Sequence, residues 1–438
     1  MAHLGVLCYQ GAGHLNPLIT LSRELVSRGH DVTFFLPAEV EPRIRQQRLG
    51  FYPIDVSGIE PKCHQAGSAA RSTSGWREDI HAQIRRFDQK IGVYIREYLA
   101  AISAARVDAL LMGEITLAGP TVAEILQIPY FVVSTSIPHN FGWTAPEALL
   151  PRRTGQEELE ASIFEVTVVS MSGPVLKILD RYRREVGLGP LIDIAVTFPE
   201  LAHITQWPKC LDTERRELPE RFFYTGPFVD ATGRSSVDFP WHKLNGQPLV
   251  YASLGTTRKA EPEIYGRIAA ACAGLDLQLV ITLGGRRNLE TFANLPGDPI
   301  VVANAPQLDL LKRADLVITH AGPNTVLETL LSGVPMLAVP LALDQPAVAA
   351  RLQALGVAEV VSARCSEYQI RAAVLRLITE RRYRDLARAM QAQLRSLHGT
   401  ERAVSIVEKA LADHRQIMPL PGEGITAAAK QVTSVAPG

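Results

Sequence analysis

Residues 314–345, ADLVITHAGPNTVLETLLSGVPMLAVPLALDQ, decide the fold class of this chain. The stretch passes from a short apolar run through a turn into an amphipathic segment, and then into a second apolar run. That order predicts a strand, a turn, a helix and another strand, the repeating unit of a sheet covered by helices. The stretch therefore predicts an α/β protein with a parallel sheet.

The same alternation continues toward both ends of the chain. The amphipathic stretch 16–29 carries Pro17 near its start and closes on Gly29, which predicts a helix after the first strand. Strands are predicted at residues 3–8, 31–37, 107–113 and 128–134 in the first half, and at 249–256, 277–285, 299–304, 314–322, 334–341 and 357–363 in the second. The predicted fold class is α/β, with two doubly wound, Rossmann-like domains in tandem that face each other across a cleft.

A segment rich in Gly, Pro, Ser and Asp, residues 226–248, has no periodic apolar face and separates the two halves. The predicted parts are a first domain 1–228, a linker 229–244, a second domain 245–395, C-terminal helices 396–418 and a mobile tail 419–438. The charged C-terminal helices are expected to complete the second domain. Because ligands in such folds bind at the carboxyl ends of the strands, the cleft between the domains is expected to hold the site.

Composition excludes several classes of protein. The chain has 438 residues with 45 Lys and Arg against 45 Asp and Glu, so its charge does not favour nucleic acid or an anionic membrane as a partner. Its five cysteines form no CxxC pair, which is typical of a reduced protein. The N-terminus lacks a signal-peptide pattern, and Glu328 and Pro335 interrupt the most apolar run, 326–343. We expect a cytoplasmic protein without a membrane span; the sequence does not indicate its oligomeric state.

The turn inside the opening stretch carries the most chemistry. His320 stands at the end of the strand, Gly322 in the turn, and Asn324 and Thr325 where the helix opens. Free N–H groups and the positive dipole end of a helix bind phosphate, and Asn, Thr and His side chains add donors. Glu328, one turn further, suits a carboxylate that holds ribose hydroxyls. The alternative is that Asn324 or Thr325 only caps the helix and that Glu328 is a solvated first-turn acid.

Further motifs accompany this turn: GAGHLNP at 11–17, YASLGT at 251–256, APQ at 305–307 and PLALDQ at 340–345. Together with HAGPNTVLETLLSGVP at 320–335, they resemble the donor-binding signature of family 1 glycosyltransferases, the nucleotide-sugar enzymes that include plant, macrolide and zeaxanthin glycosyltransferases. The resemblance covers most of the chain. It implies a GT-B fold, in which the second domain mainly binds a UDP-sugar donor and the first mainly binds the acceptor.

The resemblance also implies roles for individual residues. It places uracil on a shelf that includes Pro306 and Gln307, the ribose hydroxyls on Glu328, and the hexose hydroxyls on Asp344 and Gln345. The diphosphate would be held by a further set: His320, Gly322, Asn324, Thr325, Ser253, Gly255 and Thr256. Glu328 favours UDP over dTDP, which lacks a 2′-hydroxyl, and Asp344 with Gln345 is compatible with glucose.

The chain departs from the family pattern at two positions. Asn304 stands where many relatives carry a tryptophan that stacks on uracil, and Ala321 replaces the first glycine of a pair, which leaves Gly322 as the one glycine for a positive φ. The chain also lacks Asp-x-Asp, the pair that metal-dependent glycosyltransferases commonly use to hold a cation over the diphosphate. We therefore expect no metal, with the helix dipole and His320 offsetting the charge on the leaving UDP.

The glycine loop GAGHLN, residues 11–16, has more than one interpretation. A dinucleotide fingerprint needs glycine at the sixth position, where Asn16 stands. Otherwise His14 either supports the loop or acts as a base toward an acceptor hydroxyl, since imidazole titrates near neutrality. The resemblance implies that His14 is the base, and with it an in-line displacement of UDP that inverts the anomeric carbon.

Two further residues of the first domain are candidates. A base of this kind often has a carboxylate partner that fixes its tautomer, and Glu114, at the end of a predicted strand, is the candidate partner. The family's aspartate could instead align with Gly113, one position earlier. His139, within STSIPHNFGW, is the candidate for lining the acceptor pocket.

The favoured function is transfer of a hexose, expected to be glucose, from a UDP-sugar to a hydroxyl of a small lipophilic acceptor. Phenolic, terpenoid, carotenoid and macrolide acceptors all fit, and no cofactor is expected besides the co-substrate. Two other classes stay open. Asn304 suggests a non-catalytic nucleotide-sugar-binding protein, and the glycine loop alone suggests a nicotinamide-dependent oxidoreductase.

Overall fold

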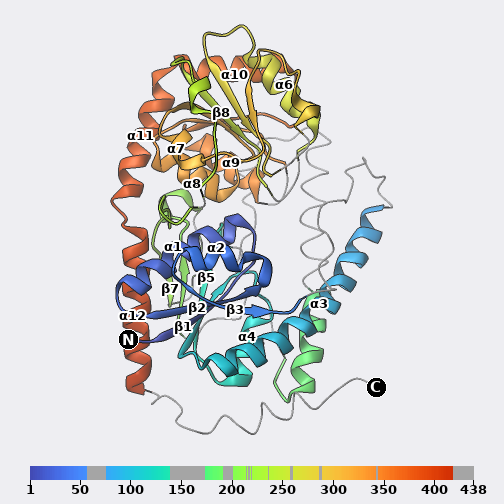
Figure 1. Cartoon of the computed structure of the whole chain (residues 1–438), viewed down its shortest axis with the longest axis vertical. Helices are drawn as coiled ribbons and strands as arrows, with labels where there is room; N and C mark the ends of the chain where they lie inside the picture. Colours follow the sequence, from blue (N-terminus) through green and yellow to red (C-terminus); the bar gives the residue numbers. More distant parts are fainter. Residues whose placement is uncertain are drawn as a thin grey trace.

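The computed structural model contains two parallel sheets, each covered by helices (Figure 1). It describes residues 1–56, 75–138, 173–190, 201–213, 215, 218, 220–234, 236–256, 260–285, 289–341 and 344–417. The predicted α/β fold class with two doubly wound domains is confirmed. The tail predicted at 419–438 lies outside the described residues.

The first sheet has seven strands in the order β3-β2-β1-β4-β5-β6-β7, all parallel to their neighbours. Their bounds are β1 His3–Leu7, β2 Asp31–Pro37, β3 Gly50–Ile54, β4 Ala109–Gly113, β5 Tyr130–Ser134, β6 Ala202–Thr205 and β7 Phe222–Tyr224. The predicted strands are confirmed as β1, β2, β4 and β5, whereas β3, β6 and β7 were not predicted. The strand order reverses at β1, and ligands of open α/β sheets bind at such a switch point.

The second sheet has six strands in the order β10-β9-β8-β11-β12-β13, again all parallel. Their bounds are β8 Leu249–Ser253, β9 Gln278–Thr282, β10 Ile300–Val302, β11 Ala314–Thr319, β12 Met336–Ala338 and β13 Ala358–Val360. Every strand predicted for this half is confirmed. Helices cover both faces of such a sheet, which is why its strands read as nearly continuous apolar runs.

Helices connect the strands of both domains. In the first domain they are α1 Ala12–Ser27, α2 Glu41–Gln46, α3 Gly75–Ala105 and α4 Gly119–Leu126. The remaining chain forms α6 Pro262–Cys272, α7 Gln307–Leu311, α8 Pro323–Leu331, α9 Gln345–Ala354, α10 Glu367–Thr379, α11 Arg381–Arg395 and α12 Gly399–Ile417. Short 3-10 turns lie at Ala38–Val40, Lys209–Leu211, Trp241–Lys243 and Glu290–Phe292.

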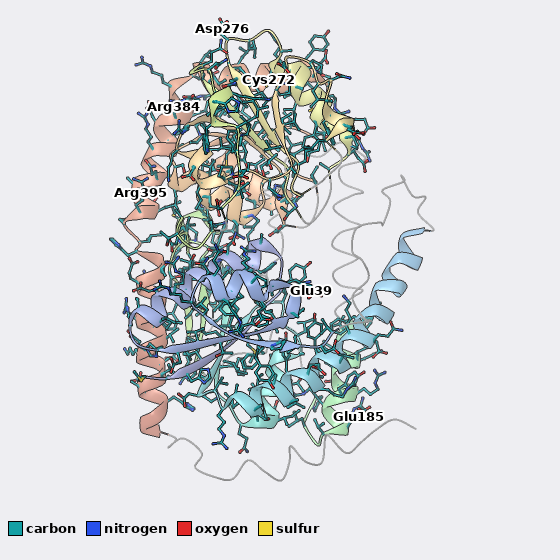
Figure 2. All side chains as sticks on the ribbon, viewed as in Figure 1. Glu39, Glu185, Cys272, Asp276, Arg384 and Arg395 are labelled. Atoms are coloured by element: carbon teal, nitrogen blue, oxygen red, sulfur yellow. The ribbon has the colours of Figure 1, made fainter. Side chains whose placement is uncertain are left out.

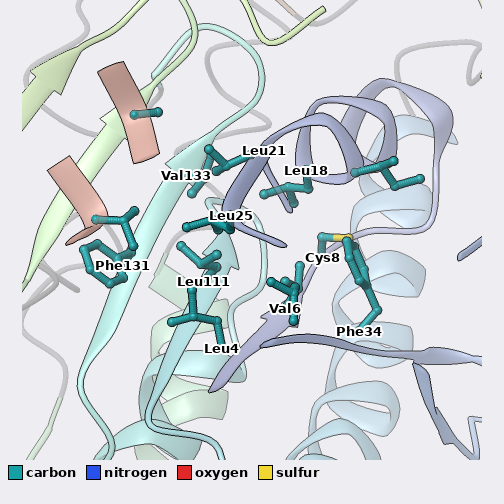
Figure 3. Close-up of a cluster of buried hydrophobic side chains, with 14 of the residues drawn as sticks. Leu4, Val6, Cys8, Leu18, Leu21, Leu25, Phe34, Leu111, Phe131 and Val133 are labelled. Atoms are coloured by element: carbon teal, nitrogen blue, oxygen red, sulfur yellow. The ribbon is translucent and has the colours of Figure 1, made fainter. Parts of the chain in front are cut away.

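Helix α1 packs on the first sheet through a stripe of leucines (Figure 3). Leu18, Leu21 and Leu25 recur at helical spacing and are fully buried. They belong to the same core cluster as Val6 of β1. Burial of each leucine contributes about 1.5–3 kcal/mol to folding. This stripe therefore holds the first turn of α1, which carries His14, at the carboxyl end of β1.

The last helix, α12, packs on the first domain (Figure 1). Ala403, Val404, Val407 and Leu411 lie on one face of this helix and join the core of the first domain. The expectation that the charged C-terminal helices complete the second domain is therefore wrong for α12, although α11 does pack against α8. The reason is the spacing of these apolar residues, which gives α12 a face to bury even though most of its other residues are polar.

The chain therefore crosses between the domains twice. The linker leads from Phe228, in the first core, to Phe239, in the second, and a return crossing leads from Leu397 into α12. The two crossings touch, because a Cβ atom added at Gly399 would lie 2.4 Å from the carbonyl carbon of Gly226. Gly226 has a φ of 113°, in the region that favours glycine. Backbone thus packs directly on backbone where the crossings meet.

Two further findings concern the described residues alone. No helix among them has both the length and the apolar character to cross a bilayer. The cysteines among them, Cys8, Cys210, Cys272 and Cys365, are free thiols.

Candidate active site

His14 lies in the first turn of α1, at the edge of the first domain that meets the second. Its Nδ1 atom lies 2.8 Å from Oγ1 of Thr135, a residue that directly follows β5 and is 2% exposed. The ring also packs edge-on against Tyr9, with 5.6 Å between the ring centroids. Because Nδ1 is committed to a protein partner, any proton transfer to a substrate falls to Nε2.

Glu114, the predicted partner of His14, stands directly after β4 and close to another histidine. Its backbone N–H donates to the carbonyl of Val133 at 3.2 Å. Burial lowers the pKa of His203 to about 4, and the negative charge of Glu114 partly opposes this shift. Thr135, the residue found on Nδ1 of His14, was not predicted. The available signal was its position at the carboxyl end of the strand beside β4.

Asn324, predicted to hold the diphosphate, joins the two domains in this structure. Its side-chain amide donates to the carbonyl oxygens of Gly13, at 2.8 Å, and Thr135, at 3.1 Å. Its own side-chain oxygen accepts a hydrogen bond from Gln206 at 2.8 Å. The capping interpretation is wrong, because the N-cap of α8 is Gly322 and no side chain caps that end. The loop that carries His14 therefore lies against the turn that was predicted to bind phosphate.

His320 follows β11 and packs against two glycines. A Cβ atom added at Gly255 or Gly322 would lie 2.6 Å or 2.4 Å from its Nε2 atom. Burial lowers the pKa of His320 to about 4, and a hydrogen bond with the backbone of Ser253 partly opposes this shift. Its Nδ1 atom is buried without a hydrogen-bond partner among the described residues. The ring is therefore neutral at pH 7 and keeps one buried nitrogen that a ligand can satisfy.

The backbone of this turn differs from the prediction. The positive φ falls on Ala321, at 63°, whereas Gly322 has a φ of −64°. A left-handed conformation costs an L-residue roughly 1–2 kcal/mol. Ala321 is fully buried, so the surrounding core holds it in this conformation. Gly322 is required for a different reason than the predicted one, since a side chain there would collide with the ring of His320.

Glu328 is 3% exposed, and both of its carboxylate oxygens have partners. Gln307 donates to Oε2 at 2.6 Å, and Arg234 of the linker donates to Oε1 and forms an ion pair. The hydroxyl of Tyr251 in turn donates to Gln307 at 3.1 Å. The interpretation of Glu328 as a solvated first-turn acid is therefore wrong. Arg234, which no sequence motif indicated, forms an ion pair with the carboxylate that was predicted to bind ribose.

A second arginine, Arg43 on α2, lies close to Arg234. Burial and the positive charge of Arg234 lower the pKa of Arg43. Arg43 donates to the side chain of Asn16, and its Nε atom is buried without a partner among the described residues. The guanidinium groups of Arg43 and Arg234 thus lie near one another, and the carboxylate of Glu328 pairs with Arg234. The resulting excess of positive charge favours an anionic ligand between the domains.

The other predicted donor-site residues lie at the carboxyl edge of the second sheet or at the helix starts that follow it. They are Ser253, Gly255, Thr256, Pro306, Thr325, Asp344 and Gln345. Ser253 pairs with Thr319, the residue before His320, and the side-chain oxygen of Gln345 accepts the backbone N–H of Leu341 at 2.8 Å. The structure thus gathers the predicted donor residues at one edge of the second sheet.

A pocket of about 750 Å³ opens in the first domain at the carboxyl ends of β2 and β3. Its lining includes Pro37, Ile54 and the three carboxylates Glu39, Asp55 and Glu97, and Glu39 is labelled in Figure 2. The volume lies within the range of small-molecule sites. His139, the predicted acceptor residue, lies outside the described residues.

Comparison with known proteins accounts for both halves of this arrangement. A family model described as UDP-glucoronosyl and UDP-glucosyl transferase matches residues 243–412, and one described as glycosyltransferase family 28 N-terminal domain matches residues 11–138. The chain belongs to the family 1 glycosyltransferases. These enzymes use nucleotide-sugar donors, so the interpretation as a nicotinamide-dependent oxidoreductase is wrong.

The similarity extends over the whole length of individual glycosyltransferases. Zeaxanthin glucosyltransferase of Pantoea ananas is 26% identical over 437 residues, which cover 98% of this chain and 100% of the relative. Oleandomycin glycosyltransferase of Streptomyces antibioticus is 26% identical and covers 96% of this chain and 93% of its own. The crystal structure of the glycotransferase of kitacinnamycin matches with a TM-score of 0.75 and 25% identity, over 94% of this chain and 99% of that one. The predicted family and its GT-B fold are confirmed.

Proposed function

We propose that this enzyme is an inverting, metal-independent glycosyltransferase that moves glucose from UDP to a hydroxyl of a small lipophilic acceptor. The observation that carries the proposal is the meeting of two loops across the domains. The loop of His14 lies against the turn of His320, through the 2.8 Å hydrogen bond from Asn324 to Gly13. Relatives named for zeaxanthin and oleandomycin support a lipophilic acceptor, and the glucosyltransferase among them supports glucose.

The nucleoside is proposed to bind at the residues joined to Glu328. Uracil rests on Pro306 and Gln307, and the ribose hydroxyls bind Glu328 once Arg234 has left it. Because Gln307 already donates to Glu328, the base shelf and the ribose ligand form one unit. A carboxylate in this place favours UDP over dTDP. Asn304, which stands where relatives carry tryptophan, leaves base binding to polar contacts and the shelf.

The diphosphate is proposed to bind at the start of α8. His320 offers a buried nitrogen without a described partner, and Gly255 and Gly322 leave room beside its ring. The N-terminus of α8 adds free N–H groups and the positive end of its dipole. Ser253, Thr256 and Thr325 complete the lining, and Asp344 with Gln345 holds the hexose hydroxyls. Asn324 serves the domain contact in this structure, so its predicted bond to phosphate would require that it first leave Gly13 and Thr135.

Catalysis is proposed to begin at Nε2 of His14. This nitrogen takes the proton of the acceptor hydroxyl as its oxygen attacks the anomeric carbon. The bond from that carbon to the UDP oxygen breaks on the opposite side, which inverts the configuration. The helix dipole, His320 and Arg43 offset the charge that builds on UDP. Glu114 stands beside His203 and is assigned only a supporting electrostatic role at this edge.

Domain roles follow from the same proposal. Residues 1–228 form the acceptor domain, 245–395 form the donor domain, and the segment 229–244 links them. The pocket at β2 and β3 has the volume of a small-molecule site and is proposed to take part of the acceptor. His139 remains a proposed acceptor-binding residue on the strength of its sequence position. We propose a cytoplasmic location, because nucleotide sugars are cytoplasmic metabolites.

The test is incubation with UDP-glucose and a panel of carotenoid, macrolide, terpenoid and phenolic acceptors in the presence of EDTA. Products are identified by mass spectrometry, and the anomeric configuration by proton NMR. We expect one acceptor class to be glucosylated with inversion, and His14→Ala to reduce kcat by about 10²–10⁴. Binding of UDP without transfer to any acceptor would instead support a non-catalytic nucleotide-sugar-binding protein. Loss of activity in EDTA would contradict the metal-free mechanism.

A further inference from the structure

Thr135 occupies the position on His14 that a carboxylate holds in many catalytic histidine pairs. Its Oγ1 atom lies 2.8 Å from Nδ1 of His14, and the residue is 2% exposed. When Nδ1–H donates to this hydroxyl, the lone pair of the neutral ring lies on Nε2. That tautomer is the one able to accept a proton from a substrate.

The backbone of Thr135 is held in place by two side-chain amides. Its carbonyl oxygen accepts hydrogen bonds from Gln206 and from Asn324, the latter at 3.1 Å. Gln206 is fully buried, and its side-chain oxygen accepts the backbone N–H of Phe228 at 3.2 Å. Both the nitrogen and the oxygen of the Gln206 amide are thus hydrogen-bonded. A buried polar network of this kind is rigid.

Asn324 connects this cluster to the second domain. The same amide that holds Thr135 also donates to the carbonyl of Gly13, the residue before His14. One side chain of α8 therefore fixes both the base and the residue that orients it. When the domains separate, the carbonyls of Gly13 and Thr135 lose this shared donor together.

We propose that Thr135 is the positioning residue of His14, and that Asn324 and Gln206 make its positioning depend on the docked second domain. The proposal rests on the proposed role of His14 as the base. In this arrangement the base is aligned only when the donor domain is in contact with the acceptor domain. A histidine that is misaligned in the open state cannot activate water or acceptor before the donor is enclosed.

The first experiment compares Thr135→Val and Thr135→Ser, with UDP-glucose and the best acceptor of the panel. Valine keeps the shape but removes the hydroxyl, so we expect kcat to fall about tenfold, the effect of one hydrogen bond. KM for UDP-glucose should stay unchanged, because Thr135 is not one of the proposed donor-binding residues. The acid limb of the pH profile should move to lower pH, since the imidazolium loses an acceptor. Serine should restore most of kcat and the original profile.

The matched control is Ser134→Ala, one position earlier in the chain. The hydroxyl of Ser134 is also buried and also bonds a histidine, with 2.6 Å between its Oγ atom and Nε2 of His203. This variant should reduce thermal stability about as much as Thr135→Val but leave the pH profile in place. If Thr135→Val keeps the kcat and pH profile of the wild type, Thr135 does not position the base.

A second experiment separates Gln206 from a purely structural residue. Gln206→Met removes both amide functions at similar volume and should lower kcat through Thr135. The double variant Gln206→Met/Thr135→Val should then lose no more kcat than Thr135→Val alone. Losses that multiply in the double variant would contradict a shared path through Thr135.

A third measurement needs no catalysis. Nitrogen-15 NMR of labelled histidines, with the His14 signal assigned from His14→Ala, reports which ring nitrogen carries the proton. We expect the Nδ1–H tautomer in the wild type and a mixture in Thr135→Val. A wild-type signal of the Nε2–H tautomer would overturn the inference. If no acceptor is turned over, the proposed function fails while this spectrum still tests the positioning of His14.

Discussion

The ion pair between Arg234 and Glu328 leads to a prediction with two opposite effects. Glu328 has 3% of its side chain exposed and Arg234 has 25%, so the pair is largely withdrawn from water. Removal of one partner of a buried pair costs about 3–5 kcal/mol, because the other charge stays buried alone. Gln307 still donates to Glu328 and part of Arg234 is exposed, so we expect Arg234→Ala to cost about 3 kcal/mol in the free protein.

The same substitution should tighten the binding of UDP. If the ribose hydroxyls bind Glu328 as proposed, they have to displace Arg234 in the wild type before they reach the carboxylate. In Arg234→Ala the Oε1 atom of Glu328 is released from the arginine, and each hydrogen bond to a charged group is worth about 1.5–3 kcal/mol. One such bond corresponds to an affinity for UDP that is roughly tenfold higher or more. The gain should be smaller for dTDP, which lacks the 2′-hydroxyl.

Calorimetric titration with UDP and dTDP, together with thermal denaturation, measures both effects. Arg23→Ala is the matched control, because it breaks the neighbouring ion pair to Asp230 of the linker, at 2.8 Å, without touching Glu328. That control should leave the affinity for UDP unchanged. If Arg234→Ala weakens UDP binding, then Arg234 contacts the donor and the reasoning about displacement is refuted.

Three further predictions concern the histidines and glycines of the structure. Because burial lowers the pKa of His203 and His320 from 6.5 to about 4, the folded protein binds fewer protons than the unfolded one in that window. The free energy of unfolding should therefore fall as the pH drops from 6.5 to 4, by about 3 kcal/mol for His203 and by less for the partly exposed His320. The variant His203→Gln should flatten this dependence of stability on pH. Binding of UDP should raise the pKa of His320, so the protein should take up protons when it binds UDP near pH 5. Calorimetry in buffers of different ionisation enthalpy measures this uptake. An uptake that persists in His320→Ala would exclude this residue as its source. Gly322→Ala should abolish UDP binding, because its Cβ would lie 2.4 Å from Nε2 of His320. The control is Gly266→Ala in α6, where an added Cβ meets nothing within 4 Å. This control should raise the free energy of unfolding by about 0.5–1 kcal/mol and leave UDP binding intact.

The second domain could be predicted from the sequence almost completely because its information is local. Each described strand of this domain except β9 is followed by a helix, and His320, Gly322 and Glu328 are read from one continuous stretch. The strands missed in the first domain depart from the strand-and-helix pattern: Pro53 lies within β3, and a 3-10 turn, Lys209–Leu211, lies between β6 and β7. Such segments give too few alternations for a periodic signal.

The residues that the sequence could not indicate act across long separations. Thr135 lies 121 positions from His14, and Arg234 lies 94 positions from Glu328. No motif joins such pairs, because only the packed sheets bring them together. The backbone of the 320–325 turn was mispredicted for a related reason. The core around Ala321 imposes a positive φ that residue preference alone assigns to glycine.

The contact between Gly226 and Gly399 has a mechanical consequence. Both segments of chain that join the domains pass through this contact, so a change in the angle between the domains has to be accommodated at or beside it. A rotation between the domains that admits the donor would then have its axis near this contact. Atoms beside the start of α12 would move least in such a rotation, and atoms further from it would move more. A methyl group added at Gly399 would push the two segments apart and change the angle between the domains, while the proposed sugar-binding residues would stay unchanged.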